Sequence, residues 1–594
     1  MKIKVADYIA NFMVENGVEH VFTVTGGGAM HLNDAFGHNQ NLTCIYNHHE
    51  QACSIAAEGY ARLTGKVAAV CVTSGPGGTN AITGVLGGWQ DSIPMFVVSG
   101  QVKRETTTWS TDIPLRQLGD QEFQIADCVS NMTKYAVMIT EPNQIRYHLE
   151  KAWYLCNNGR KGPVWLDVPL DVQAAIIDTE DLVAYDCAED RQEEVVYDTS
   201  ITAKIMDRIK QAQKPVILVG TAIRIADAYD EMLSVVEKLG VPVVTAWNAH
   251  DLLPEDAPYY CGRPGTVGLR GGNYVIQNSD LLIVLGCRLN IRMISYNYKA
   301  FAKNAYKIMV DIDKNELIKP TIKIDMPIHA NVKDVLKDMD AYIKKNGWNP
   351  IQVSWLRWAK SVHEKHPAVL KNYRDESRPL NPYVFVEEFF KGLEGDDVVA
   401  CGNGSACVVT FQAANIKKGQ RLFTNSGCAA MGYGFPAAIG CAVSRKGERV
   451  ICIDGDGSFQ MNIQELQTVV YHQMNLKIVI MNNNGYHSIR QTQTNLFKGD
   501  LIGVCDGNGI SFPDMEKIAY AYGIPYVRVE KEQDIQVVMD KMFAQDGPYL
   551  CEVIVDEKQN FEPKLSSKVK PDGTIVSPEL DDLFPFIEKE VYEG

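Results

Sequence analysis

Three patterns that would place this chain in a common functional class are missing. The fifteen cysteines are scattered, with no Cys-x-x-Cys pair and no histidine-rich cluster, which argues against disulfides and zinc sites. No apolar run is long enough to span a membrane. The net charge is −15 and there is no long basic run, which argues against a nucleic-acid partner.

The chain does contain enough apolar residues for a large core. Of its 594 residues, 46% are hydrophobic and 22% are charged, as in soluble globular proteins, and this length predicts about three domains. Most cysteines, such as Cys71 and Cys452, stand in apolar runs, so we expect reduced core residues. The N-terminus leads straight into an amphipathic segment without a signal peptide. We therefore expect a cytoplasmic protein.

Residues 450–486 predict a strand, a glycine turn, a helix and a second strand. Val450 to Ile453 is a β-branched run, as is typical of a buried parallel strand. We expect Gly455 and Gly457 to let the backbone turn sharply and approach a ligand. Ser458 then leads into a helix over about residues 459–472, whose N-terminus would attract a phosphate group.

Two polar side chains follow the two predicted strands, at the edge where ligands bind open α/β sheets. The carboxylate of Asp456, the amide oxygen of Asn483 and the carbonyl oxygen of Gly485 form a hard ligand set that suits Mg²⁺. A lone Gly-Asp-Gly is more often an ordinary βαβ turn. The spacing of 27 residues between acid and amide (483 − 456) makes this pattern far more specific.

Residues 1–177 alternate strand-like and helix-like segments, which predicts a doubly wound parallel sheet. One strand ends in a glycine run that includes Gly27 and Gly28, and another ends in TSGPG at 73–77. The same order of segments returns in residues 380–556, where the metal motif stands. Two domains of one topology, only one with the metal motif, predict a cofactor between them.

A third α/β unit is expected in residues 198–346, after an acidic linker over about 178–198. Its strand ends have Arg288, Arg292 and Asp311, which could hold a dinucleotide, although a Gly-x-Gly-x-x-Gly fingerprint is missing there. A packing domain without a ligand is the alternative. Residues 347–381 predict a helical connector, and residues 557–594 form a tail that either folds over the site as a lid or packs on the surface.

Many short motifs in order resemble the catalytic subunit of acetolactate synthase, a thiamine diphosphate (ThDP) enzyme. They are HEQ at 49–51, GYARLTG at 59–65, TSGPG at 73–77, DSIPM at 91–95, GQV at 100–102, FQ at 123–124, MGYGFPAAIG at 431–440 and GDGSFQMNIQE at 455–465. The resemblance implies an α/β chain of three doubly wound parallel-sheet domains. In chain order these would be pyrimidine-binding, central FAD-type and diphosphate-binding.

The resemblance also implies roles for individual residues. Glu50 resembles the acid that shares a proton with the aminopyrimidine of ThDP, and Met431 the residue that wedges the cofactor into its bent shape. Phe123 and Gln124 would line the substrate side. Further cofactor contacts are implied at Gly27, Gly28, Asn403, Gly404, Gly455, Gly457, Ser458, Arg288, Arg292 and Asp311. Cofactors would be ThDP, Mg²⁺ and FAD, and the family builds each site from two subunits, which implies a homodimer or homotetramer.

Three departures from the family pattern bear on the acceptor. Ser488 and Thr492 stand where the biosynthetic synthases have Met and Trp, the stretch between residues 102 and 123 is about eleven residues longer, and the tail is longer. A more open acceptor wall favours transfer of the two-carbon unit of pyruvate to a nucleotide-linked keto-sugar. Ordinary acetolactate synthesis, a pyruvate oxidase-type flavoenzyme and a catalytically silent regulatory subunit are the alternatives, and the intact Glu50, Asp456 and Asn483 argue against the last.

Overall fold

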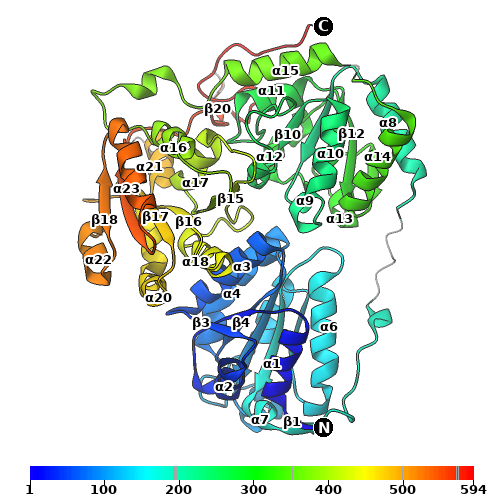
Figure 1. Cartoon of the computed structure of the whole chain (residues 1–594), viewed down its shortest axis with the longest axis vertical. Helices are drawn as coiled ribbons and strands as arrows, with labels where there is room; N and C mark the ends of the chain where they lie inside the picture. Colours follow the sequence, from blue (N-terminus) through cyan, green and yellow to red (C-terminus); the bar gives the residue numbers. More distant parts are fainter. Residues whose placement is uncertain (191–196, 351, 498, 570–571, 573, 594) are drawn as a thin grey trace.

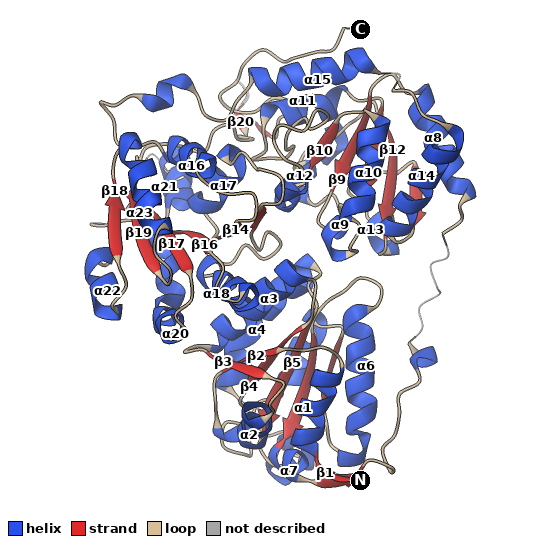
Figure 2. Cartoon of the chain, viewed as in Figure 1, coloured by secondary structure: helices blue, strands red, loops and turns tan. Residues whose placement is uncertain are grey.

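Three large parallel sheets form three α/β domains in a computed structural model of the chain (Figure 1). It describes residues 1–190, 197–350, 352–497, 499–569, 572 and 574–593. Helices lie on both sides of the strands, so each sheet is doubly wound (Figure 2). The expected fold class is confirmed. The exact domain limits stay a prediction, and residues 191–196 of the expected linker lie outside the described residues.

The N-terminal sheet has six strands in the order β3-β2-β4-β5-β7-β6, and every neighbouring pair is parallel. Its central strands β4, β5 and β7 are fully buried, which explains their nearly continuous apolar sequences. The elements are α1 Val5–Glu15, β2 His20–Thr23, α2 Met30–His38, β3 Thr43–Tyr46, α3 Glu50–Thr64, β4 Ala68–Val72, α4 Pro76–Asp91, β5 Met95–Gln101, α5 Ile125–Val129, β6 Tyr135–Met138, α6 Ile145–Asn157, β7 Val164–Pro169 and α7 Leu170–Ala174.

The C-terminal sheet has the order β15-β14-β16-β17-β19-β18, which is the N-terminal order strand for strand. The repeat that the sequence predicts is therefore confirmed as a shared topology. The elements are α16 Pro382–Lys391, β14 Val398–Cys401, α17 Ser405–Ala413, β15 Arg421–Phe423, α18 Gly434–Arg445, β16 Val450–Gly455, α19 Asp456–Phe459, α20 Leu466–Tyr471, β17 Leu476–Asn482, α21 His487–Leu496, α22 Met515–Tyr522, β18 Tyr526–Val529, α23 Ile535–Phe543 and β19 Tyr549–Ile554.

The middle sheet is five-stranded, in the order β10-β9-β11-β12-β13. The expected helical connector contains α15 Val353–Lys365, which packs its buried Trp355 under the sheet and donates the indole N–H to the Pro215 carbonyl at 2.9 Å. The elements are α8 Ser200–Gln211, β9 Pro215–Val219, α9 Ala222–Ile225, α10 Tyr229–Leu239, β10 Val243–Thr245, α11 Arg270–Asn278, β11 Leu281–Leu285, α12 Ile291–Ile294, β12 Tyr306–Asp311, α13 Lys314–Ile318, β13 Met326–His329 and α14 Val332–Asn346.

Helices α3 and α18 press the N-terminal and C-terminal domains together at the centre of the molecule (Figure 1). Glycine permits this approach, because a Cβ at Gly59 would lie 2.5 Å from the Ala437 carbonyl oxygen, and one at Gly440 would lie 1.9 Å from that of Ala56. Beside them the Tyr433 hydroxyl donates to Glu58 at 2.6 Å. The GYARLTG and MGYGFPAAIG motifs therefore include the residues of a tight helix crossing.

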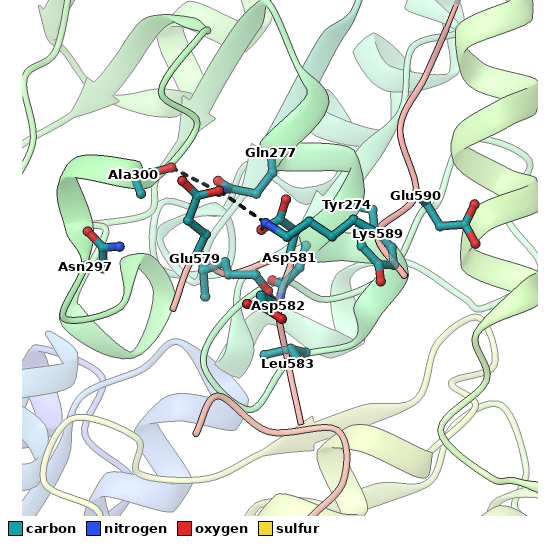
Figure 3. A network of polar contacts seen from close by, with 12 residues as sticks. Tyr274, Gln277, Asn297, Ala300, Glu579, Asp581, Asp582, Leu583, Lys589 and Glu590 are labelled. Carbon is teal, nitrogen blue, oxygen red and sulfur yellow. Dashed lines mark hydrogen bonds and ion pairs between the residues drawn. The ribbon is translucent and has the colours of Figure 1, made fainter. Parts of the chain in front are cut away.

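The C-terminal tail starts beside the C-terminal domain, where Phe561 packs against His487, and later lies on the middle domain (Figure 3). Side chains of α11 hold the tail mainly by donating hydrogen bonds to carbonyl groups of the tail backbone. Arg270 donates to the Leu583 carbonyl at 3.1 Å, and Asn273 and Asn278 donate to those of Leu580 and Glu590 at 2.8 and 3.1 Å. Lys589 pairs with Asp581 at 2.7 Å within the tail. Most of the tail thus packs on the surface of the middle domain, and only its first residues lie near the candidate site.

One expected element is wrong. The helix expected over about 459–472 is broken into α19, a 3₁₀ turn Gln460–Glu465 and α20. The break lies at Asn462, whose φ of −137° is not helical. Its side-chain amide donates to the Gly432 carbonyl at 2.8 Å and to Gln51 at 3.0 Å, so contacts outside the helix override local propensity.

No helix in the part of the chain that the structure describes is long and apolar enough to cross a membrane.

Candidate active site

Asp456 lies at the end of β16, with its carboxylate enclosed by two backbone turns. Oδ1 accepts from the Gly457 N–H at 3.0 Å and Oδ2 from the Gly485 N–H at 2.8 Å. Burial raises the pKa of Asp456 to about 7, and these two hydrogen bonds oppose the rise. A bound cation would compensate the buried charge. The structure thus brings Asp456 and Gly485 into direct contact, through the Gly485 N–H and not through the carbonyl that was expected to bind the metal.

Asn483 is the second expected metal ligand and follows β17. Its Nδ2 donates to the Ser405 hydroxyl at 2.8 Å, so the amide oxygen is oriented away from Ser405. That oxygen is buried and has no hydrogen-bond partner among the described residues. Within the same part of the chain, no three His, Cys, Asp or Glu side chains form a metal cluster. The residues present fit an oxygen-ligated cation such as Mg²⁺, with Asn483 Oδ1 available to it.

The glycines of this turn act differently from the expectation. Neither Gly455 nor Gly457 has a positive φ, so a sharp turn is not what requires them. A Cβ at Gly457 would lie 2.3 Å from a ring carbon of Tyr486, whereas the Cβ side of Gly455 is open. Gly457 is therefore needed for close packing, and Gly455 leaves room beside the turn for a ligand.

Two further segments of the diphosphate domain border this turn. The Ser458 hydroxyl accepts from the N–H of Gly432 at 2.9 Å, which fixes the backbone next to Met431. Asn403 donates to the Ala430 carbonyl at 2.8 Å on the other side of Met431. Gly404 has a φ of 77°, which favours glycine, and begins α17. The structure thus gathers Asn403, Met431 and Ser458 around one backbone segment.

Glu50 is the first residue of α3, where the helix dipole favours a carboxylate. His49 caps the helix, its Nδ1 accepting from the N–H of Gln51 at 3.1 Å. Asn80 of α4 donates to Glu50 Oε2 at 3.0 Å. The other carboxylate oxygen faces the small residue Gly77, where an added Cβ would lie 3.6 Å away. Space beside Glu50 is therefore kept by the TSGPG turn.

The segment around Glu50 is bonded to the segment that follows the Asp456 turn. Glu465 accepts from the Asn47 side chain at 3.0 Å and from the His48 N–H at 3.0 Å, both buried or half-buried. Sequence reasoning missed Glu465 as the residue that joins the two motifs. The signal in the sequence is that a charged residue ends the motif, in which Asp456 is the other charged residue.

Gly27 and Gly28 lie beside the TSGPG turn. The Gly28 N–H donates to the Thr73 hydroxyl at 3.0 Å, and a Cβ at Gly28 would lie 2.5 Å from the Ser74 hydroxyl oxygen. The Cβ side of Gly27 is open. These glycines let the end of β2 approach the end of β4, and Gly27 is the one with open space beside it.

Phe123 and Gln124 lie just before α5 and are exposed in the single chain. The side chain of Gln101, the last residue of β5, donates to the Phe123 carbonyl at 2.8 Å. Gly75, with a φ of 59°, permits close packing here, because a Cβ on it would lie 2.5 Å from the Gln121 carbonyl oxygen. The pair is therefore fixed at its backbone and open at its side chains.

Ser488 and Thr492 lie one turn apart on α21. The Thr492 hydroxyl donates to the Ser488 carbonyl at 2.9 Å, so its proton is used within the helix. The Thr492 side chain is exposed. For Thr492, therefore, only the oxygen lone pairs remain for a hydrogen bond with an acceptor substrate.

Two buried residues of α21 were missed by sequence reasoning. Arg490 donates to the carbonyls of Asn483 and Asn484 at 3.0 and 2.5 Å and so fixes the turn that contains Asn483. His487 is 5% exposed, and burial together with the charge of Arg490 lowers its pKa to about 4. Its ring packs edge-on against Phe561 of the tail, with centroids 5.1 Å apart. The 3.6-residue spacing was the only signal for these inward positions.

A cavity of about 320 Å³ lies at the strand ends of the middle domain. Arg288 and Asp311 line it, together with Gly220 and Gly286, whereas Arg292 is outside its lining. Burial raises the pKa of Asp311 to about 6. Residues from the other two domains, such as Asp91 and Ser426, close the cavity. The position at the carboxyl ends of parallel strands is the usual one for a dinucleotide.

Comparisons with known proteins agree with this arrangement. Family models match residues 3–127 as a thiamine pyrophosphate enzyme N-terminal TPP binding domain, 202–339 as the central domain and 402–553 as the C-terminal TPP binding domain. A probable acetolactate synthase large subunit of Methanococcus aeolicus is 31% identical and aligns over 91% of this chain and 90% of its own. The acetolactate synthase isozyme 1 large subunit of Escherichia coli is 30% identical, over 94% of this chain and 95% of its own, and the acetolactate synthase large subunit of Lactococcus lactis is 30% identical over 94% of each. The chain therefore belongs to the thiamine pyrophosphate enzymes and is an acetolactate synthase-like, ThDP-dependent member of that family.

Proposed function

We propose that the protein decarboxylates pyruvate and transfers the two-carbon unit to a carbonyl acceptor. When bound, ThDP supplies the electron sink for loss of CO₂. Asp456, Asn483 and the Gly485 carbonyl would hold Mg²⁺ on its diphosphate. Glu50 would hold a proton against the aminopyrimidine, and Met431 would set the bend of the cofactor. Two observations support the metal: the buried Asn483 oxygen has no hydrogen-bond partner among the described residues, and Gly485 of the same turn donates its N–H to Asp456.

The acceptor is proposed to be a nucleotide-linked keto-sugar. The observation that supports this is the outer face of α21, where Ser488 and the exposed Thr492 leave the space that Met and Trp fill in the synthases. A pocket without those apolar side chains would hold the methyl group of a second pyruvate weakly. The preference that results is limited, because the apolar contacts of one methylene are worth only about 1–3 kcal/mol. Ordinary acetolactate synthesis is the second candidate, favoured by the similarity to acetolactate synthases.

A flavin is proposed for the cavity at the middle domain, with Arg288 and Asp311 as contacts. The purified protein should then be yellow and release FAD on denaturation. A colourless preparation that is fully active without flavin would refute this. If electrons from pyruvate reached the flavin productively, flavin bleaching by pyruvate alone would instead indicate a pyruvate oxidase-type reaction.

A homodimer or homotetramer is proposed because the family forms each site from two subunits. Exposed apolar side chains near both half-sites support it, among them Phe123, Met461 and Ile489 at 39%, 46% and 50% exposure. Sedimentation of the purified protein would test this. The cytoplasmic location also stays a prediction.

Mass spectrometry of the products tests the proposed reaction. Pyruvate is supplied alone and with ketone acceptors, including a nucleotide-linked 4-keto-sugar. The proposal expects a two-carbon adduct of the sugar and faster pyruvate consumption in its presence. Rapid acetolactate formation that no ketone accelerates would identify an ordinary acetolactate synthase. No consumption under any condition would favour a silent subunit.

A further inference from the structure

Residues 103–122, between β5 and α5, are the segment that we expect to be longer than in the synthases. It forms two 3₁₀ turns, Arg104–Thr106 and Thr108–Ser110, followed by irregular chain. One acidic side chain, Glu122, lies at its centre and is only 8% exposed. It accepts from the Thr108 hydroxyl at 2.8 Å, from the Thr108 N–H, and from the N–H groups of Leu118 and Gly119 at 2.8 and 3.2 Å.

These contacts connect the two ends of the loop through one carboxylate. Burial opposes the charge of Glu122, but the hydrogen bonds from Thr108, Leu118 and Gly119 outweigh it and lower the pKa of Glu122. Three of its four donors are backbone groups, so the carboxylate fixes the path of the chain. The loop therefore has a defined conformation although its surface is exposed.

The loop in turn holds the side chain of Gln124. The Trp109 indole nitrogen lies 2.9 Å from one atom of the Gln124 amide, and the Thr108 hydroxyl, whose single proton is shared with Glu122, lies 2.7 Å from the same atom. An indole nitrogen only donates, so the atom that faces it must be the amide oxygen. In this orientation the Gln124 nitrogen points the other way and donates to Asp127 at 3.2 Å. Its second N–H remains for another acceptor.

The backbone beneath Gln124 is held from the opposite side. Gln101 at the end of β5 donates both to the Phe123 carbonyl, at 2.8 Å, and to the buried Asp167 of β7, at 3.0 Å. The sheet thus fixes where Phe123 and Gln124 stand, and the loop fixes how the Gln124 amide is turned. Only the second of these depends on the additional residues.

We propose that residues 103–122 form a specificity loop in which Glu122 is a positioning residue, and that Thr108 and Trp109 turn Gln124 into a hydrogen-bond donor toward the substrate. The group that it recognises is an oxygen that only accepts, such as a carboxylate or ketone oxygen. This inference rests on the proposed function, because that function places Gln124 on the substrate side.

The first test compares Glu122→Gln with Glu105→Gln in the same loop. Glu105 is exposed and is outside the network, so it reports on the loss of one charge alone. Glu122→Gln replaces an acceptor with a group that faces backbone donors, and a charge-assisted bond is lost. We expect the KM of a substrate to rise roughly 10-fold with kcat little changed, and no change for Glu105→Gln. Equal behaviour of the two variants overturns the inference.

The second test is a double-mutant cycle between Trp109→Phe and Gln124→Ala. Trp109 is 47% exposed, so the phenylalanine variant keeps the fold and loses only the N–H donor. If the loop acts through Gln124, Trp109→Phe raises KM several-fold in the natural protein and has no effect once Gln124 is alanine. Fully additive effects overturn the inference. If Gln124→Ala alone leaves all kinetic constants unchanged, the substrate-side role of Gln124 in the proposed function fails instead.

Discussion

The N-terminal and C-terminal domains have the same strand order but differ in the turn after their third strand. In the N-terminal domain Ser74, Gly75 and Pro76 follow β4, and at the matching place in the C-terminal domain Asp454 and Gly455 end β16 and Asp456 follows it. Pro76 has neither a free N–H nor a ligand atom, whereas Asp456 at the matching place offers a carboxylate. The two domains therefore share one topology, and Asp456 is the residue of this turn on which the proposed metal site of the C-terminal domain depends.

A second pair of positions is alike in both domains. β5 and β17 each have seven residues and end in an amide, Gln101 and Asn482. Each amide donates to a buried acid on the next strand, Gln101 to Asp167 at 3.0 Å and Asn482 to Glu552 at 2.6 Å. Each amide also accepts a backbone N–H, from Val102 or Asn484. In both halves an acid–amide pair fixes the start of the loop that carries the site.

Exchanging the turn residue should produce the largest effect. Asp456→Ala removes the buried carboxylate and should weaken ThDP retention in the presence of Mg²⁺ more than about 100-fold, with activity lost. Pro76→Ala, at the matching position, should leave cofactor affinity within a few-fold. Calorimetric titration of both variants checks this. Natural affinity in Asp456→Ala would show that the two turns do not differ in the way proposed.

Glu50→Gln addresses the half without a metal. The amide keeps the contact with Asn80 in shape but cannot exchange a proton, so the variant should bind ThDP and lose roughly 10²–10⁴-fold in rate. Hydrogen–deuterium exchange at the reactive carbon of bound ThDP, followed by NMR, measures this step directly. Glu15→Gln, at an exposed position of α1, is the control. Natural exchange in Glu50→Gln would remove the proposed role from the N-terminal domain.

Thr492→Trp sharpens the contrast between this chain and the synthases. An indole on the outer face of α21 should fill the acceptor space and shift preference from a keto-sugar to pyruvate by about 10-fold or more. Thr494→Trp, two residues on and so on another face of α21, should leave the preference unchanged. Competition between the two acceptors, with products resolved by mass spectrometry, gives the ratio. An equal shift in both variants would indicate a nonspecific effect of the indole.

Local patterns account for what the sequence could predict. The run from Val450 to Ile453 is apolar and rich in β-branched residues because both faces of its strand are buried, and β16 begins at Val450 as predicted. The Asp456 and Asn483 spacing could be interpreted because two adjacent parallel strands end at one edge. The shared topology of the two outer domains followed from repeated short motifs in the same order.

Long-range contacts account for the features that the sequence could not predict. Asn462 breaks its helix because Gln51, 411 positions away, and Gly432 take its amide. The path of the tail depends on side chains of α11 that donate to backbone carbonyls of the tail. Every residue has such a carbonyl, so the sequence does not indicate which ones are bound. Asp167 and Gln101 stand 66 positions apart, so their pairing was visible only once β5 and β7 lay side by side.

Asp167→Asn gives the smallest predicted effect and tests the acid–amide pair of the N-terminal domain. Burial raises the pKa of Asp167 to about 7 from 3.8, although Ser99 and Gln101 donate to the carboxylate. The folded chain therefore keeps this proton to a higher pH than the unfolded chain does. Between about pH 4 and pH 7 the unfolded state loses the proton first, so the contribution of Asp167 to stability falls as pH rises and is constant above pH 7.

Asparagine keeps the shape and removes the titration. The melting temperature of the variant should therefore rise by a few degrees relative to that of the natural protein as pH increases from 5 to 7. A change of about 1 kcal/mol in the free energy of unfolding shifts the melting temperature of a domain of this size by about 2–4 °C. Thermal unfolding in matched buffers at pH 5, 6, 7 and 8 measures the difference. If the melting temperatures of the two proteins change with pH in parallel, Asp167 does not titrate in this range. Asp167 would then remain an ionised carboxylate while Gln101 links it to the Phe123 segment.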